Sequence, residues 1–520
     1  MNTSLILAVD CGTSSARTII FDAATGKQMS VAQIPWQRTE DDHGATRFDT
    51  EGNWKIICNC IRKNLEDFSA KNIIAITTTS FRHGLVCIDR DGLVVFACHN
   101  ADPRSDEQVK RLNETGLAET VFRITGDSPT INALPILMWL RENHPESFSK
   151  IWKALSVAGW ASYKLSGKTA VEPSMASATC LFDVKKLEWS DEVLEIAGFG
   201  PEILPDLVPS DSKVGSVTKE VAFETGLLEG TPVFVPLGDT QAAMIATGDI
   251  APGRSSLIGG TFWLEAQTTG EPITDEALFL RTQCHCVKDV WFNEGCSFYV
   301  GPFISWFVKT FGCEDSESEG VYAKDFDELT RKAALVPPGA YGLQAIWSNL
   351  TNVSNWRHCA PAFLDWDILE PSRSSKEVFF RAILEMEAML AFGDFERIRN
   401  VTGLWPGSMS FSGGAASNEL LAQILSDVMK ARITVFDSSE CSALGGVMIA
   451  SAASGIYDSL ESCVKSMSNI KTEYLPSVEA NEVYMAKYRR WRSIYDSLLK
   501  LSDDGMTKHL WIAAGARKHT

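Results

Sequence analysis

The sequence lacks several signatures that would assign it to a common protein class. It has no G-x-x-x-x-G-K-[ST] loop and no G-x-G-x-x-G turn opening a βαβ unit. Neither a P-loop kinase nor a Rossmann dehydrogenase is therefore expected. No apolar run approaches the ~18 residues that span a bilayer, and the first residues lack the charged segment of a signal peptide. These absences favour a cytoplasmic protein without a membrane partner.

Positive charge is also scarce. The chain carries 48 Lys and Arg against 66 Asp and Glu, a net charge of -18. Nucleic acids and anionic membranes bind basic surfaces, so we expect small-molecule partners and no nucleic acid. A nucleotide remains compatible with this charge, because a few backbone amides can bind a phosphate in an acidic protein. The composition is also compatible with a homodimer.

The thirteen cysteines include no C-x-x-C pair of the kind found in structural zinc sites. Two C-x-C pairs occur, Cys58/Cys60 and Cys284/Cys286, and His285 lies within the second. We interpret the cysteines as reduced thiols that pack like small apolar residues. A metal site at one of these pairs is the lesser alternative.

The length of 520 residues predicts two domains, because one hydrophobic core rarely serves so long a chain. Strand, glycine turn and returning strand occur in each half, at residues 5–21 and 255–267, and helical patterns occur at 54–68, 378–398 and 443–453. This alternation predicts α/β layers and a duplicated architecture. We expect an N-terminal domain over 1–250, a C-terminal domain over 251–475 and a helical tail over 476–520.

The first glycine turn has the residues of a phosphate-binding loop. Asp10 ends an apolar strand, and Gly12, Thr13, Ser14 and Ser15 follow it. Gly12 lets backbone amides approach a phosphate closely, and the hydroxyls add donors. Asp10 is placed to hold Mg²⁺ through water. By itself, the segment is equally an ordinary hairpin turn.

Two later turns have a similar composition. Gly260 and Thr261 lie between two predicted strands, and Gly413 and Gly414 precede Asn418 between a strand and a helix. Each turn is a candidate for contact with a nucleotide or its phosphates. The alternatives are an ordinary hairpin turn and the N-terminal turn of a helix.

Asp239 is the candidate catalytic base. It follows Gly238 at the end of an apolar run from 233 to 237 and precedes a helical pattern. Phosphoryl transfer to an alcohol requires a group that accepts the hydroxyl proton, and a carboxylate at a strand end is placed for this. Asp239 also fits a helix N-terminus, and both interpretations can hold together.

The order of these motifs resembles that of the FGGY carbohydrate kinases. The segments at 10–14, 238–239, 259–261 and 412–418 look like the first phosphate loop, the catalytic-base motif, the second phosphate loop and the adenosine motif of that family. The resemblance covers residues 4 to 460. It implies two actin-like, ribonuclease-H-like ATPase domains with a cleft between them, the sugar mainly on the first domain and ATP on the second.

The resemblance also implies roles for individual residues, with ATP and Mg²⁺ as cofactors. Asp239 is the expected base and Asp10 the magnesium residue. Arg82, His83 and Asp102, with Asp239, are the expected substrate contacts. The expected ATP or phosphate contacts are Gly12, Thr13, Ser14, Ser15, Gly260, Thr261, Gly413, Gly414 and Asn418.

Within the family, the chain most resembles the autoinducer-2 kinases. The supporting segments include Gly259–Trp263, Val336–Gly339 and the tail Asp504–Thr507. Such kinases phosphorylate the terminal hydroxyl of linear 4,5-dihydroxy-2,3-pentanedione, a quorum-sensing signal. His83 stands where Glu is expected, and Gly159 where Asp is common. The alternatives are a xylulose, ribulose, erythritol or glycerol kinase and, more remotely, a non-catalytic actin-like ATP-binding protein.

Overall fold

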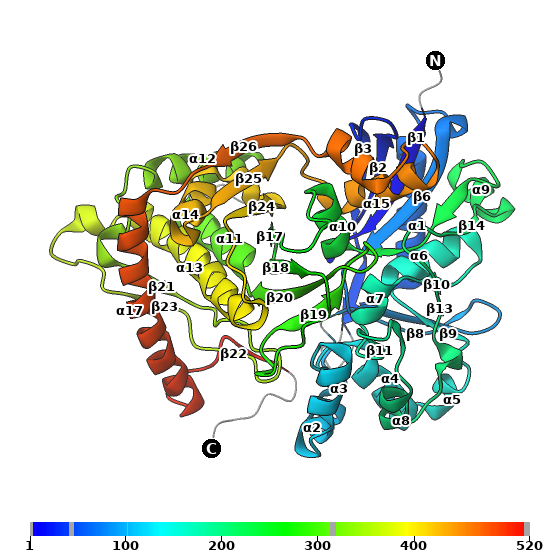
Figure 1. The fold of residues 1–520 in the computed structure, drawn as a ribbon, viewed down its shortest axis with the longest axis horizontal. Coiled ribbons are helices and arrows are strands. Elements are labelled where there is room, and N and C mark those ends of the chain that lie inside the picture. The colour runs from blue at the N-terminus through cyan, green and yellow to red at the C-terminus, as the bar shows by residue number, and fades with distance from the viewer. Residues whose placement is uncertain (1–3, 41–45, 101, 313–318, 514–520) are drawn as a thin grey trace. The chain divides into compact units, whose positions relative to one another are not determined.

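The computed structural model describes residues 4–40, 46–100, 102–312 and 319–513. The chain forms two compact units, each built from more than one segment (Figure 1). The predicted domains were continuous ranges, whereas each unit draws on three segments. Unit 1 comprises Met1–Pro252, Thr268–Phe292 and Glu440–Asn469, and unit 2 comprises Gly253–Gln267, Asn293–Ser439 and Ile470–Thr520.

The main sheet of unit 1 has the strand order β14-β15-β6-β1-β2-β3, and β16 also pairs with β6. β1, β2 and β3 are antiparallel neighbours, and β6 runs parallel to β1. Every residue of β1 is buried, which explains its continuous apolar run. The strands are β1 (Leu5–Cys11), β2 (Ser15–Asp22), β3 (Gln28–Pro35), β6 (Ile73–Ser80), β14 (Lys213–Ser216), β15 (Pro232–Phe234) and β16 (Leu237–Gly238).

Helices pack against this sheet. α1 contacts β2 and β3, α6 contacts β6, and α15 contacts β1, β6 and α10. The close packing of α15 depends on two glycines: a Cβ at Gly445 would overlap the carbonyl oxygen of Ala242 in α10, and one at Gly446 would meet Thr77 in β6. The helices are α1 (Thr50–Asn64), α6 (Val157–Ser166), α10 (Asp239–Ala246) and α15 (Cys441–Ala453).

Unit 1 also contains a second sheet and a group of short helices with their own apolar cluster. The sheet has the order β4-β5-β8-β7-β9, made of β4 (Arg38–Glu40), β5 (Thr46–Phe48), β8 (Val94–Cys98), β7 (Leu85–Ile88) and β9 (Lys153–Leu155). The helices of this group are α2 (Asp106–Glu114), α3 (Leu117–Thr125), α4 (Ala133–Asn143), α5 (Pro145–Phe148) and α8 (Asp191–Ala197). Unit 1 also contains α7 (Pro173–Ser177), α9 (Lys219–Thr225), which contacts α1, and α16 (Leu460–Met467), which contacts α10 and α15.

The sheet of unit 2 repeats the pairing pattern of unit 1. β17 and β18 form an antiparallel hairpin, and β24 runs parallel to β17, as β1, β2 and β6 do in unit 1. The strands that contribute residues to unit 2 follow the order β20-β18-β17-β24-β25-β26, in agreement with the predicted duplication. The strands are β17 (Ser255–Gly259), β18 (Trp263–Thr269), β20 (Trp291–Ser297), β24 (Ser408–Ser412), β25 (Arg432–Phe436) and β26 (Ile470–Tyr474).

Long helices accompany the sheet of unit 2. α13 is largely buried and contacts α11, α12, α14 and α17. Its C-terminus is capped by Gly403 at a φ of 74°, a left-handed conformation that favours glycine. The helices are α11 (Val300–Phe311), α12 (Glu319–Ala333), α13 (Lys376–Thr402), α14 (Glu419–Met429) and α17 (Val478–Asp503).

Two predicted elements differ from the structure. The apolar run 233–237 was predicted as one strand, but it forms the end of β15 and the start of β16, with Pro236 between them. Proline lacks the N–H that a central strand donates to its ladder. The predicted helical tail is only partly helical, because the segment after α17 contains β27 (Trp511–Ile512), which pairs with β22 (Arg357–His358).

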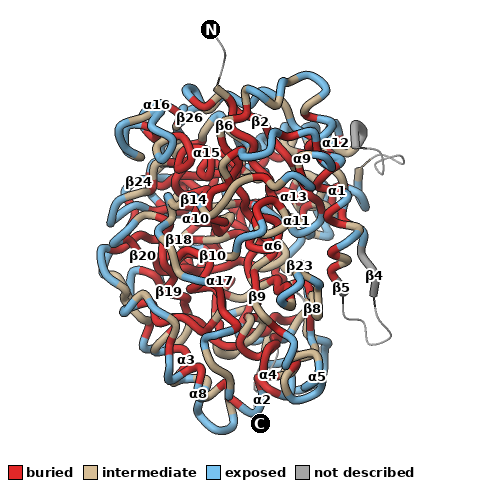
Figure 2. The backbone as a smooth tube through the Cα atoms, turned by 90° about the vertical axis from the view of Figure 1, so that its right-hand side faces the viewer, coloured by how far each residue is buried: buried red, intermediate tan, exposed pale blue. Residues whose placement is uncertain are grey.

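Buried residues follow the sheets and the helix faces packed on them (Figure 2). All of the cysteines that the structure describes are buried and free, as expected for reduced thiols. In the described part of the chain, no helix combines the length and apolar character needed to cross a bilayer.

Glu387 on α13 provides a test of how this core tolerates charge. It is fully buried, and neither carboxylate oxygen has a hydrogen-bond partner among the described residues. Burial raises the pKa of Glu387 well above its ordinary value, so folding requires proton uptake above the unfolded pKa. We expect Glu387→Met to raise the free energy of unfolding by about 1–3 kcal/mol near pH 8. The gain should shrink as the pH falls toward the unfolded pKa, as measured by denaturant unfolding.

The matched control lies two residues earlier on the same helix. Glu385 is also fully buried, but its carboxylate accepts from Arg381 (2.8 Å), Lys487 (2.6 Å) and the backbone N–H of Gly339 (2.9 Å). Glu385→Met leaves two buried cations unpaired and should destabilise the protein. Equal effects of the two substitutions would contradict this account of Glu387.

Candidate active site

The loop of residues 12–14 joins β1 and β2 in unit 1, and its carbonyl groups are held from outside the loop. Trp36 donates two hydrogen bonds, from its indole N–H to the carbonyl oxygen of Gly12 (2.6 Å) and from its backbone N–H to the carbonyl oxygen of Ser14 (3.0 Å). His99 Nε2 donates to the carbonyl oxygen of Thr13 (2.9 Å). These bonds engage the three oxygens that would repel a phosphate. The side chains of Thr13 and Ser14 are exposed, as a phosphate-binding loop requires.

Ser15 occupies a different environment from the other loop hydroxyls. It is the first residue of β2, it is buried, and its Oγ accepts a hydrogen bond from Gln33 (2.9 Å). Its predicted phosphate contact therefore has less support than those of Thr13 and Ser14.

Asp10 lies at the end of β1 and is 4% exposed. Its Oδ1 accepts from Thr79 Oγ1 (2.9 Å), and its Oδ2 pairs with Arg17 Nη2 (2.9 Å). Arg17 also binds Glu440 through Nη1, at 3.0 and 3.2 Å. One guanidinium thus lies between two carboxylates, which leaves a net negative charge beside the loop. A hydrated Mg²⁺ fits such a donor set.

Asp239 is the first residue of α10, directly after β16. Its Oδ1 accepts the backbone N–H of Thr240 at 2.7 Å, which fixes the side chain. Burial raises the pKa of Asp239 to about 6; Arg82 opposes this rise and Asp10 adds to it. Because the charges of Arg82 and Asp10 both act on Asp239, these three predicted site residues lie near one another. A carboxylate with a pKa near 6 is ionised at neutral pH and accepts a proton readily.

His83, another predicted substrate residue, directly follows Arg82 in the sequence. It adopts a φ of 69°, which is unusual for a residue other than glycine. Its Nδ1 lies 3.2 Å from the carbonyl oxygen of Ala178 and must donate to it. Burial, with the charges of Arg82 and Arg281, lowers the pKa of His83 well below its ordinary value. The ring is therefore neutral, and its Nε2 lone pair is left as an acceptor.

Asp102 is 4% exposed and already has a cation partner. Arg104 binds it through Nε at 2.8 and 2.9 Å, and through Nη2. The Arg104 guanidinium in turn lies 5.0 Å from the Phe96 ring centroid and 5.1 Å from that of Trp139. This arrangement holds the carboxylate rigidly, as a specificity residue requires.

The glycine turns of unit 2 lie against one another. A Cβ at Gly413, whose φ is 83°, would overlap the backbone of Gly259, so this contact needs glycine. Gly414 is different, because a Cβ there would meet nothing within 4 Å. Gly260 and Thr261 are exposed, as is Gly414. A ligand can therefore reach all three positions.

Both the oxygen and the nitrogen of the Asn418 side-chain amide form hydrogen bonds within the protein. Its Oδ1 accepts from the backbone N–H of Leu421 (3.1 Å) and caps α14, while Nδ2 donates to Thr330 Oγ1 (3.3 Å). It is 2% exposed. Asn418 therefore positions the turn, and its direct contact with a nucleotide stays a prediction.

The sequence motifs did not indicate Arg17 and Thr79, which bind Asp10, or Glu440, which binds Arg17. Arg17 had a usable signal, because it pairs directly with Asp10 in the register of the β1–β2 hairpin. Glu440 had none, since it is 423 positions away from Arg17 in the chain.

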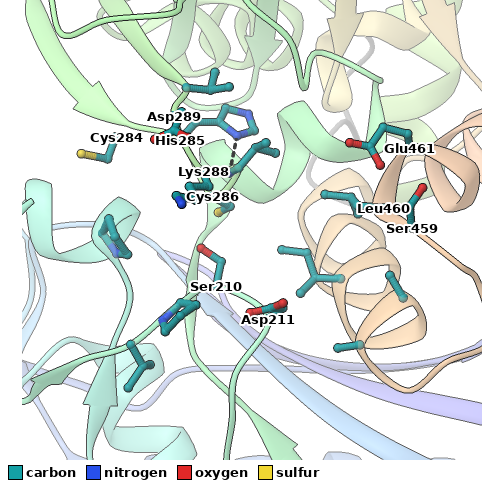
Figure 3. A pocket seen from close by; sticks show the side chains of 18 of the residues that line it. Ser210, Asp211, Cys284, His285, Cys286, Lys288, Asp289, Ser459, Leu460 and Glu461 are labelled. Carbon is teal, nitrogen blue, oxygen red and sulfur yellow. Dashed lines mark hydrogen bonds between the residues drawn. The ribbon is translucent and has the colours of Figure 1, made fainter.

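A cavity of unit 1 contains none of the predicted site residues. It has a volume of about 660 Å³ and is lined largely by apolar side chains, with His285 and Asp289 on one side and Ser459 and Glu461 on another (Figure 3). Over the described ranges, no group of three or more His, Cys, Asp or Glu side chains is arranged to hold a metal ion. The C-x-C pair beside His285 therefore does not form a metal site of that kind.

Comparison with known proteins gives matches along nearly the whole chain. Residues 5–246 match the model of the N-terminal domain of the FGGY family of carbohydrate kinases, and residues 258–454 match that of its C-terminal domain. A protein of Yersinia enterocolitica named autoinducer-2 kinase is 33% identical over 518 residues, which cover 98% of each chain.

Solved structures support the same fold. Gluconate kinase from Lactobacillus acidophilus is similar with a TM-score of 0.84 at 18% identity, over 95% of this chain and 98% of that one. Glycerol kinase from Plasmodium falciparum, solved with ADP, has a TM-score of 0.83 at 18% identity, with the same coverage. These similarities, with the duplicated α/β sheets, confirm the predicted fold class.

Proposed function

Because the chain belongs to the FGGY family of carbohydrate kinases, we propose that it transfers the γ-phosphoryl group of ATP to autoinducer-2. The acceptor is the terminal hydroxyl of linear 4,5-dihydroxy-2,3-pentanedione. The observation that carries this proposal is 33% identity over 98% of both chains to a kinase named for that substrate. The resemblance seen in the sequence is thereby confirmed at the level of the family.

Asp239 is the proton acceptor in this proposal. As the substrate oxygen forms its bond to the γ-phosphorus, the bond between that phosphorus and the bridging oxygen of ADP breaks, and the hydroxyl proton passes to the Asp239 carboxylate. The hydrogen bond from Thr240 orients the carboxylate. Arg82 stabilises its charged form before the transfer.

Backbone and hydroxyl groups bind the phosphates. Thr13 and Ser14 lie in a loop whose carbonyl oxygens are already engaged. In unit 2, exposed Gly260, Thr261 and Gly414 are open to the nucleotide. Bound Mg²⁺ would neutralise charge on the phosphates, and Asp10 would hold it through water.

The substrate side combines one cation, one neutral imidazole and one carboxylate. Arg82 can donate to a carbonyl or hydroxyl oxygen, whereas His83 Nε2 and Asp102 accept from hydroxyls. Such a set suits a small molecule that carries both carbonyl and hydroxyl groups.

An acceptor screen tests the proposal. ADP release would be followed with the dihydroxypentanedione, xylulose, ribulose, erythritol, glycerol and gluconate at matched concentrations. We expect the highest kcat/KM for the dihydroxypentanedione. A higher value for any of the others would reassign the substrate within the family, and no acceptor-dependent turnover would remove the kinase assignment.

The pH dependence follows from the pKa of Asp239. That pKa is raised to about 6, so the carboxylate is protonated and unable to accept a proton at lower pH. We expect kcat/KM to fall about tenfold per pH unit below pH 6 and to level off above pH 7. A profile that stays flat down to pH 5 would contradict the assignment of the base.

A further inference from the structure

Unit 2 contains an arginine-rich groove between α13 and α17. The groove has a volume of about 490 Å³. α13 contributes Arg397 and Arg399, and α17 contributes Arg489 and Arg492. This is unexpected in a protein with a net charge of -18, and none of the four belongs to the site described above.

Close packing of the two helices forms the base of the groove. A Cβ at Gly393 would lie 2.5 Å from Leu350 Cδ2 and 2.8 Å from Tyr488 Oη, so glycine permits this approach. The Tyr488 hydroxyl donates to Glu396 Oε2 at 2.7 Å. One nearby acidic group is therefore already engaged by a neutral donor.

Two of the four guanidinium groups are already held by neighbouring groups of the protein. Arg397 donates to the carbonyl oxygen of Thr351. Arg492 lies 5.4 Å from the Trp491 ring centroid and 5.9 Å from that of Tyr495, and it donates to Asn349 Oδ1 at 3.4 Å. Both also interact with carboxylates, because Asp496 pairs with Arg492 at 3.4 Å and the charges of Arg397 and Arg492 oppose the rise in the pKa of buried Asp394.

The other two guanidinium groups are available to a ligand. Arg399 and Arg489 are exposed, and within the described ranges their side chains have no hydrogen-bond or ion-pair partner. Among the residues that line the groove, Glu396 carries the one carboxylate, and it accepts from Tyr488. The lining therefore contains four guanidinium groups against one carboxylate and carries a net positive charge.

We propose that this groove binds a small phosphorylated molecule at a site separate from catalysis. Guanidinium groups bind phosphate oxygens through two parallel N–H donors. A concave site with four of them suits a phosphate ester or a diphosphate. The groove is sized for a small ligand, which favours such a molecule over the flatter acidic surface of a protein.

Titration calorimetry with inorganic pyrophosphate tests the site in the full chain. We compare the wild type with Arg399→Ala/Arg489→Ala, which removes the two free guanidinium groups. The double variant should lose one of the pyrophosphate sites or weaken it at least about tenfold. Kinase turnover at saturating substrates should stay unchanged, because neither residue lies in the catalytic site.

The control variant is Arg331→Ala/Arg432→Ala. These are two exposed arginines of unit 2 that pair with Glu328 and Glu473. It removes the same charge and should leave pyrophosphate binding unchanged. Equal binding in all three proteins, or equal loss in both variants, would overturn the proposal. If the double alanine variant folds poorly, Arg489→Glu alone should abolish the second site.

Discussion

Asp239→Asn should lower kcat by about 10²–10⁴-fold, the range that a positioned general base supplies. The amide keeps the size of the side chain but cannot accept the hydroxyl proton. Because the proposal assigns the phosphates to other residues, the affinity for ATP should stay near that of the wild type. Single-turnover kinetics and an equilibrium titration with a non-hydrolysable ATP analogue would measure the two quantities.

The pH profile separates a lost base from a distorted site. In the Asp239→Asn variant, the fall in activity below pH 6 should disappear, because the titrating carboxylate is gone. Asp211→Asn is a suitable control, since Asp211 is an exposed carboxylate of the same unit outside the site. It should keep both the turnover and the profile. If the Asp239→Asn protein turns over at the wild-type rate, another group accepts the proton.

Gly445→Ala should destabilise the protein by about 3 kcal/mol or more, an upper-range cost for overpacking a core. The added methyl group would overlap the carbonyl oxygen of Ala242, a backbone atom that cannot rotate away. α15 would have to move from α10, and it begins directly after Glu440, which binds Arg17. We therefore expect a lower unfolding midpoint together with reduced turnover.

Gly407→Ala is the matched control for that substitution. Gly407 is exposed, its φ is not in the left-handed region, and a Cβ there would meet nothing within 4 Å. Its midpoint should stay close to that of the wild type in the same denaturant series. A similar midpoint for the Gly445→Ala protein would show that α15 and α10 are not packed as described.

Local sequence was sufficient for much of the first unit. The run of apolar residues before Asp10 predicted a buried strand, and the glycine turn predicted a hairpin. The hairpin register also places Arg17 opposite Asp10, so this ion pair could have been found by counting from the turn. The motif itself ends at Ser15, two residues before Arg17, so the motif alone does not indicate the pair.

The interruption at Pro236 was harder to predict from the apolar pattern alone. The run from 233 to 237 is apolar throughout, and apolar periodicity does not distinguish one strand from two. The missing N–H of proline was the available signal. The position of Asp239 was still predicted correctly as the start of a helix directly after a strand.

The sequence by itself determined the family, the two glycine-turn hairpins and the carboxylate at the start of α10, because these depend on residues that are neighbours in the chain. Only the tertiary structure decided the pairing of Glu440 with Arg17, the rise in the pKa of Asp239 and the gathering of four arginines between α13 and α17. Each of these features depends on burial or on charges from segments that are far apart in the chain. A local sequence pattern does not show which distant segments meet in the fold.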